Sequence, residues 1–154
     1  MPDKTTMRRA RRDARQGKSA STQAGEFVRE EIEHIREGKH GARSTKQAIA
    51  IGLSKARRAG VKLAPPDPSK NSKRTVQKAR EDAAAATQPH KPAKRRSRAT
   101  LAALQREAAD SASAEALSKQ ARAAASRRTK ADRSKAAKKA AATRARDKRA
   151  PAQD

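Results

Sequence analysis

The stretch EFVREEIEHIREGKHGARSTKQAIAIGLSKARRAGVKL, residues 26–63, decides the fold of this 154-residue chain. It contains nine of the fifteen hydrophobic side chains that are larger than alanine, so it is the only candidate for a folded core. A unit of about 40 residues is close to the size at which a single core needs further support. We therefore expect this unit to associate with a second copy or to be stabilised by a ligand.

The first half of this stretch predicts a helix over residues 22–37, with Thr22 or Ser21 as its N-cap. Gly38 can adopt the left-handed conformation that commonly ends a helix. The large apolar residues recur at the spacing of one helical face: Val28, Ile32 and Ile35.

The second half predicts a helix that begins after Ser44 and ends at Gly60. Ser-Thr-Lys-Gln at residues 44–47 is a capping box, in which the serine caps the helix and the glutamine reaches back. Val61 and Leu63 are expected to fold back over the helix pair. One face is small and apolar and would let a neighbouring helix approach closely: Ala48, Ile49, Gly52, Leu53 and Ala56. The sequence therefore predicts an all-α fold without a sheet.

Composition excludes a single compact globule of the whole chain. There are 37 alanines, no Trp or Tyr, and a formal net charge of +24. Few large apolar groups and high charge are typical of chains that cannot offset their ordering entropy by burial. A deep, aromatic-lined active-site pocket is excluded on the same grounds. Because no nucleophile has an orienting pair, we predict no catalytic residue and no enzyme.

Charge and proline positions divide the chain into four parts. These are a basic N-terminal arm (1–21), the helix–loop–helix unit (22–63), a Pro-containing basic linker with one candidate helix (64–97) and an Ala/Lys/Arg-rich tail (98–154). The tail has high helix propensity but no large apolar face, so we expect it to become helical when phosphates neutralise it. Further helices are expected at residues 72–87, 113–128 and 129–147, and around Leu101 and Leu104.

The charge indicates a polyanionic partner. Nucleic acid is the commonest polyanion, and the sequence pI of about 11.6 fits it. Base readout is not expected, because aromatic side chains for stacking are scarce. We predict sequence-tolerant, histone-like binding of DNA by phosphate neutralisation. Two alternatives stay open: an RNA- or ribosome-associated protein, and a protein-interaction module acting through residues 22–63.

Positive charge next to a helix N-terminus defines the candidate phosphate contacts. Residues 38–46 combine two glycines and three cations with a helix start, where backbone N–H groups and the helix dipole favour an anion. The alternative is a turn whose glycines only allow the bend, and a run of cations is more often a solvated face. The predicted nucleic-acid-binding residues are Lys39, Arg43, Ser44, Lys46, Lys55, Arg57, Arg58, Lys62, Lys94, Arg95, Arg96, Arg127, Arg128, Lys138 and Lys139.

An acidic stripe is expected on the first helix, opposite its apolar face. A solubilising surface is the simplest interpretation. The alternatives are that the stripe binds the basic tail, or the basic helix of a second copy, which would make the unit a homodimer. The predicted interaction residues are Glu26, Glu30, Glu33 and Glu37, together with an exposed Ile51 on the second helix.

Histidine does not define a metal site in the sequence. His34, Glu37 and His40 lie within reach of one another, but no fourth candidate ligand stands at a spacing that is typical of a zinc site. The chain also lacks cysteine, which excludes disulfides and zinc thiolates. We therefore predict no metal ion and no cofactor.

Residues 26–63 resemble a family of small basic bacterial proteins that share a domain of unknown function. The resemblance implies a bacterial cytoplasm and carries no activity, so no functional residue is transferred. With the predicted DNA binding it places the protein at the nucleoid. The Ala/Lys/Arg-rich tail is similar in composition to the tails of linker histones. No apolar run approaches the length of a membrane span, so no membrane partner is expected.

Overall fold

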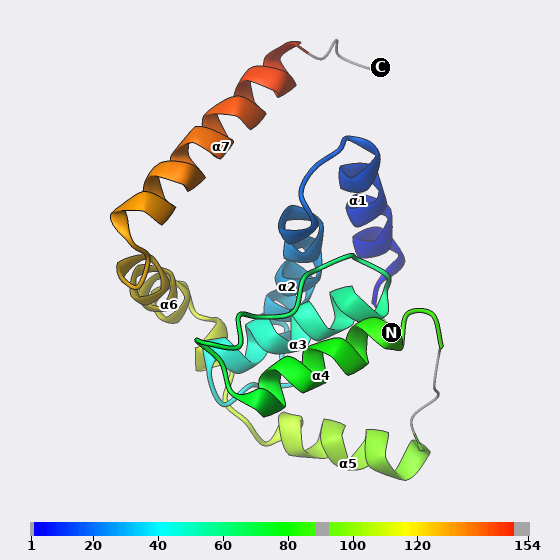
Figure 1. Ribbon diagram of the computed structural model, residues 1–154. Coiled ribbons are helices and arrows are strands. Elements are labelled where there is room, and N and C mark those ends of the chain that lie inside the picture. The colour runs from blue at the N-terminus through cyan, green and yellow to red at the C-terminus, as the bar shows by residue number, and fades with distance from the viewer. Residues whose placement is uncertain (1, 89–92, 150–154) are drawn as a thin grey trace. The chain divides into compact units, whose positions relative to one another are not determined.

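The computed structural model describes residues 2–88 and 93–149 of the chain, and Figure 1 shows an all-α fold. The described residues form seven α-helices and one short 3₁₀-helix, with no strand. The all-α prediction is confirmed. The elements are α1 (Lys4–Arg15), α2 (Ala20–Arg36), α3 (Thr45–Arg58), α4 (Lys73–Ala84), α5 (Lys94–Gln105), η1 (Asp110–Ala112), α6 (Ala114–Ser126) and α7 (Lys130–Arg149).

The chain separates into two compact units, residues 1–117 and residues 118–154. In the first unit, α2 packs against α3, α1 packs against α2, and α4 packs against α3. The second unit contains the end of α6 and the whole of α7. It has no hydrophobic side chain larger than alanine, so it holds no core of its own.

Helix α2 begins two residues earlier than the sequence predicts. Its N-cap is Ser19, whose Oγ accepts a hydrogen bond from the Thr22 backbone N–H at 3.3 Å. Neither Ser21 nor Thr22 is the cap, because both already have helical backbone conformation. Gly38 has φ +71°, which confirms the left-handed stop after the helix.

Helix α3 confirms the capping box, with one change of partner. The Ser44 Oγ accepts a hydrogen bond from the Gln47 N–H at 3.2 Å. The Gln47 Oε1 accepts from the Arg43 N–H at 2.9 Å, one residue before the cap. Gly60, with φ +90°, follows the end of the helix as predicted.

The small face of α3 lies directly against α2. A Cβ placed on Gly52 would lie 2.6 Å from the Val28 Cα, so only glycine permits this approach of the two backbones. Ala48 and Ala56, one helical turn away on either side, are fully buried. The predicted close contact is confirmed, and it is why alanine and glycine can build a core in this chain.

Two apolar clusters make up the core around α2 and α3. One contains Ile32 and Ile35, and the other is built around Phe27, whose side chain has no exposed surface. Val61 and Leu63 pack against the Phe27 cluster, which confirms that they fold back over the helix pair. The second cluster also takes in Met7 and Ala10 of α1.

Helix α1 forms within the basic arm of residues 1–21, for which the sequence analysis predicted no specific helix. Thr6, Ala10 and Asp13 recur at helical spacing and are buried. The Asp13 carboxylate accepts a hydrogen bond from Lys18 Nζ at 2.9 Å, so its charge is balanced. The arm is therefore part of the folded unit.

Residues 104–112 also belong to the first unit, although the sequence analysis assigned them to the tail. The Leu104 carbonyl accepts a hydrogen bond from the Gly41 N–H at 2.9 Å, and a Cβ on Gly41 would collide with the Glu107 carbonyl. The Thr45 Oγ1 donates to the Ser111 carbonyl at 2.7 Å. Ala112 is almost completely buried against α2 and α3.

Candidate nucleic-acid interface

A line of positive charge runs along the face of α1 opposite α2. Lys4, Arg8, Arg11 and Arg15 are spaced four, three and four residues apart, which places them on one helical face. All four are exposed, and with Pro2 and Met7 they line one open surface pocket. The line covers the twelve residues of the helix, and the rise from Lys4 to Arg15 is roughly 16 Å. We call these four residues the α1 basic stripe.

No acidic side chain lies within the α1 basic stripe. The one acidic residue within α1, Asp13, is buried on the other face and bound to Lys18. Like charges at these spacings destabilise a helix by about 0.2–0.5 kcal/mol per pair. A bound polyanion would remove this repulsion, so the stripe has the electrostatics of a phosphate-binding surface.

The sequence analysis missed the α1 basic stripe, although the signal is present. The spacing of Lys4, Arg8, Arg11 and Arg15 is helical, and so is that of the buried Thr6, Ala10 and Asp13. A helix was not predicted because its buried face holds a threonine and an aspartate in place of large apolar residues. That face becomes a core face only when α2 covers it.

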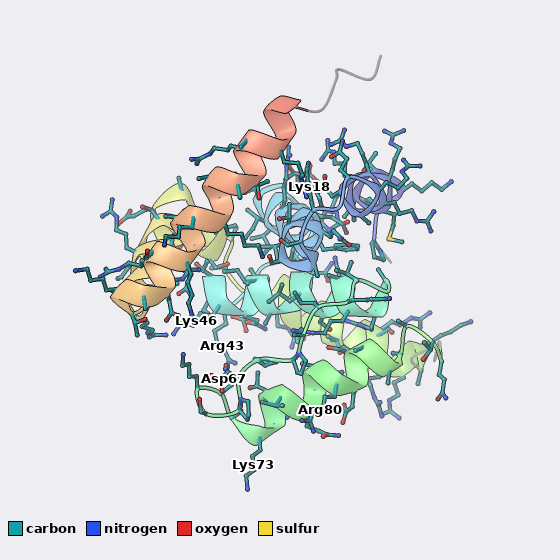
Figure 2. All side chains as sticks on the ribbon, turned by 45° about the horizontal axis from the view of Figure 1, so that its top comes forward. Lys18, Arg43, Lys46, Asp67, Lys73 and Arg80 are labelled. Carbon is teal, nitrogen blue, oxygen red and sulfur yellow. The ribbon has the colours of Figure 1, made fainter. Side chains whose placement is uncertain are left out.

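The junction between α2 and α3 places three predicted contacts on the surface. Lys39, Arg43 and Lys46 are exposed, and Figure 2 shows Arg43 and Lys46 close together at the start of α3. Lys39 Nζ lies 2.8 Å from Glu37 Oε2. The hydrogen bond between them lowers the pKa of Glu37 and raises the pKa of Lys39, so both are charged at neutral pH.

Three consecutive backbone N–H groups of this junction, those of residues 41–43, are already bonded within the protein. The Gly41 N–H donates to the Leu104 carbonyl and the Ala42 N–H to the Ala108 carbonyl, at 2.9 and 3.2 Å. The Arg43 N–H is taken by the Gln47 side chain, and Ser44 Oγ is occupied as a cap. The physical reason is that residues 104–112 fold over the loop.

Two of the predicted contacts on α3 face inward. Lys55 Nζ lies 2.6 Å from Glu31 Oε2 and 3.5 Å from Glu30 Oε1, and both carboxylates are buried. Arg57 is buried and donates a hydrogen bond to the Ala64 carbonyl at 3.3 Å. Lys55 and Arg57 therefore stabilise the fold and are not part of an exposed basic face.

Replacing Lys55 with methionine is expected to destabilise the first unit by about 3 kcal/mol, because two buried carboxylates lose their cation. The affinity for DNA and its salt dependence are expected to stay close to those of the parent chain. Urea unfolding followed by circular dichroism and a DNA titration check the two effects. A variant that keeps its stability but loses DNA affinity would make Lys55 a phosphate contact after all.

The remaining α3 cations are exposed to different extents. Arg58 is half exposed, lies 3.6 Å from Asp82 of α4 and donates to Ser54 Oγ at 2.9 Å. Asp82 also accepts a hydrogen bond from Ser54, which joins α4 to α3, and one from Lys78 of its own helix. Lys62 is exposed.

The acidic residues of α2 do not form one exposed stripe. Glu30 is 3% exposed, and its Oε2 accepts a hydrogen bond from the Asp3 backbone N–H at 3.1 Å. The Glu26 side chain is partly covered by α1. Glu33 and Glu37 are exposed but paired with Arg29 and Lys39. The expectation was wrong because α1 packs on this face of α2.

Ile51 is half-buried where the sequence predicts an exposed residue. It lines a groove of about 660 Å³ that also includes side chains of α4 and α5. The groove also contains Arg57, Arg58 and Asp82, which are engaged in the hydrogen bonds and ion pair described above.

The predicted contacts of the linker and tail are all exposed. Lys94, Arg95 and Arg96 form the first turn of α5, which has no side-chain cap. Arg127 and Arg128 lie between α6 and α7, and Lys138 and Lys139 lie on α7. Helix α7 carries nine Lys and Arg and two Asp over 20 residues, a net charge of +7, without an apolar face.

The histidines lie beside a carboxylate that the sequence analysis did not consider. Glu31, His34 and His40 bring one ligand atom each to within 4.8 Å of one another. Glu37, the predicted neighbour, is exposed and paired with Lys39. The missed signal is the spacing of Glu31 and His34, which are three residues apart on one helix. His90 lies outside the described residues.

Residues 4–67 match a family model described as a family of unknown function, DUF6496. The DUF6496 segment runs from the first residue of α1 to the loop before α4 and holds three packed helices. The resemblance to a family of unknown function is confirmed, and the segment includes the α1 basic stripe. Comparisons with curated proteins and with solved structures gave no match. Within residues 2–88 and 93–149, no helix is long and apolar enough to cross a bilayer.

Proposed function

We propose that this protein binds double-stranded nucleic acid, DNA in preference to RNA, through the phosphate backbone and without base readout. The observation that carries the proposal is the α1 basic stripe, four exposed cations on one face of a folded helix. Binding neutralises phosphates and releases their counterions, which gives affinity without sequence preference. This is the mode of a histone-like, nucleoid-associated protein in a bacterial cytoplasm.

Side-chain chemistry supports sequence-tolerant binding. The single aromatic residue of the chain other than histidine, Phe27, is completely buried and cannot stack on a base. The exposed side chains of the α1 basic stripe are lysine and arginine, which bind phosphate well. The protein therefore has cations for the backbone and few groups for the bases.

The second unit supplies a further polyanion-binding segment. Residues 118–154 contain 13 Lys and Arg and three Asp, a net charge of +10. A helix of the length of α7 is about 30 Å long, which spans close to one turn of duplex DNA. Because α7 buries no apolar face, neutralisation by phosphates would contribute much of its stability.

A salt titration tests the proposal. A labelled duplex of about 30 base pairs is titrated with the full chain, with residues 1–117 and with residues 118–154, between about 50 and 200 mM salt. If ten phosphates are contacted, the full chain is expected to show a log–log slope of roughly −9. Each separated unit should show a shallower slope, because each contributes part of the contacts.

Three outcomes would contradict the proposal. A flat salt dependence would mean that phosphates are not the ligand. Binding only in the millimolar range at low salt would exclude a nucleic-acid function. Equal or tighter binding to duplex RNA of the same length would favour an RNA- or ribosome-associated protein.

A further inference from the structure

The cluster of Glu31, His34 and His40 takes no part in the proposed nucleic-acid binding. Glu31 and His34 lie on the last turns of α2, and His40 lies in the connection to α3. Both histidine side chains are largely buried, at 15% and 10% exposure, and the Glu31 side chain is 1% exposed. The cluster therefore lies in the interior of the first unit and not on its charged surface.

The hydrogen bond of His40 directs one ring nitrogen at Glu31. His40 Nδ1 lies 3.1 Å from the Gly41 carbonyl oxygen, and a carbonyl can only accept, so Nδ1 carries the proton. In the neutral ring, Nε2 then has a lone pair, and it lies 3.2 Å from Glu31 Oε1. Two lone pairs at this distance require a cation or a proton between them. A metal-bound histidine also commonly donates its other ring N–H to a backbone carbonyl, as His40 does here.

Glu31 can offer one oxygen to a metal ion while it keeps its ion pair. Its Oε2 lies 2.6 Å from Lys55 Nζ, and its Oε1 faces His40. Apart from the Lys55 contact of Oε2, neither oxygen accepts a hydrogen bond, although the side chain is almost completely buried. Buried carboxylate oxygens without such a bond are rare in proteins and call for a partner.

The charges around the cluster also favour a divalent cation. A second set that could hold a metal ion, Asp3, Glu30 and His34, shares a histidine with the first. Asp3 Oδ2 lies 3.4 Å from His34 Nε2. Lys55 pairs with Glu30 and Glu31, and Lys39, which pairs with Glu37, also lies near Asp3 and Glu30. Four carboxylates, Asp3, Glu30, Glu31 and Glu37, are therefore balanced by two cations. With neutral histidines the local charge is −2 in a chain of net charge +24.

We propose that Glu31, His34 and His40 bind one divalent transition-metal ion, with Zn²⁺ as the preferred ion. Two imidazoles and one carboxylate are a known zinc ligand set that leaves a fourth position for water or a further carboxylate. Ligand atoms about 2.0–2.1 Å from a tetrahedral ion lie about 3.3 Å apart. The separation of His40 Nε2 and Glu31 Oε1, 3.2 Å, matches this value.

The bound ion joins the end of α2 to the α2–α3 connection. This connection carries Gly41 and Ala42, whose N–H groups donate hydrogen bonds to the carbonyls of residues 104 and 108. Metal binding therefore stabilises the arrangement of the first unit, because a ligand that binds only the folded state shifts the folding equilibrium. The inference is independent of the proposed nucleic-acid function, whose α1 basic stripe shares no residue with the metal site.

Calorimetric titration of the full-length, untagged and chelator-treated chain with Zn²⁺ alone tests the inference. One Zn²⁺ per chain is expected. In thermal unfolding, free Zn²⁺ at about one hundred times its dissociation constant should raise the folded-to-unfolded ratio about a hundredfold. Co²⁺ in place of Zn²⁺ should give the visible absorption of a tetrahedral site. The absence of stoichiometric binding, or binding without stabilisation, would overturn the inference.

Single-residue variants locate the site. His34→Gln and His40→Gln are each expected to weaken Zn²⁺ binding by at least about ten- to a hundredfold, since a direct ligand matters at least as much as its supporting residues. Glu33→Gln is the matched control, because Glu33 is exposed on the same helix and paired with Arg29. Circular dichroism of each apo variant confirms that it is helical. Equal affinity of a helical His40→Gln variant and the Glu33→Gln control would exclude the site.

Discussion

Replacing Lys4, Arg8, Arg11 and Arg15 together with glutamine is expected to weaken DNA binding by up to about three orders of magnitude at about 0.1 M salt. Each lost phosphate contact removes about 0.9 from the log–log salt slope, so four contacts reduce its magnitude by about 3.6. The four side chains are exposed, and the buried face of α1 is unchanged in this variant. Fluorescence anisotropy over a range of salt concentrations measures both quantities.

The same variant is expected to unfold at a higher temperature than the parent chain at low salt. The substitutions remove five like-charge pairs at i,i+3 or i,i+4 spacing along α1, two of which involve Arg12, and each pair costs about 0.2–0.5 kcal/mol. Lower DNA affinity together with unchanged or higher stability is the signature of a binding surface. A loss of both would indicate that the four residues support the fold.

Exposed cations elsewhere in the first unit provide the matched control. Lys70, Lys73, Arg74 and Arg80 are exposed, and Figure 2 shows Lys73 and Arg80 projecting from α4. Their replacement by glutamine lowers the net charge by the same four units. The control is expected to weaken DNA binding far less. Equal losses in the two variants would show that net charge alone determines the affinity and that α1 is no special surface.

Replacing Phe27 with alanine is expected to destabilise the first unit by about 3–5 kcal/mol. Phe27 is the largest of the fully buried side chains, and its cluster joins α1, α2 and α3. Most other buried apolar residues are alanines, which cannot fill the cavity. Because small domains have about 5–15 kcal/mol of stability in total, thermal and urea unfolding should show a large shift.

Leu101→Ala is the control for this prediction. Leu101 is 47% exposed on α5, so its truncation leaves no cavity and should change the stability by less than about 0.5 kcal/mol. Similar small effects of both substitutions would mean that the Phe27 cluster does not hold the three helices together.

The helices that sequence patterns predict best are those with local stop and start signals. The capping box before α3 and the glycines after α2 and α3 act within a few residues, and the structure confirms all three. Helix α4, predicted at residues 72–87, begins at Lys73 with Ser72 as its cap. Where the local signal was ambiguous, as among Ser19, Ser21 and Thr22, the predicted cap was wrong.

The candidate site was harder to predict, because exposure depends on distant segments. Lys55 resembles Lys46 in sequence, yet one is paired with buried carboxylates and the other is exposed. Glu30 was placed on a solvent face because no pattern in α2 shows that α1 covers it. A helical spacing identifies a face but not the surface that faces it.

The sequence by itself determined the all-α class, the α2–α3 hairpin with its close contact at Gly52, and the net charge of +24. These follow from local backbone preferences, small side chains and net charge, which need no knowledge of distant contacts. Only the tertiary structure decided which charges are exposed. It placed the cations of α1 on the surface, enclosed Lys55 among carboxylates, and brought Glu31 and His34 to His40. The physical reason is that burial and charge pairing depend on segments that are far apart in the chain.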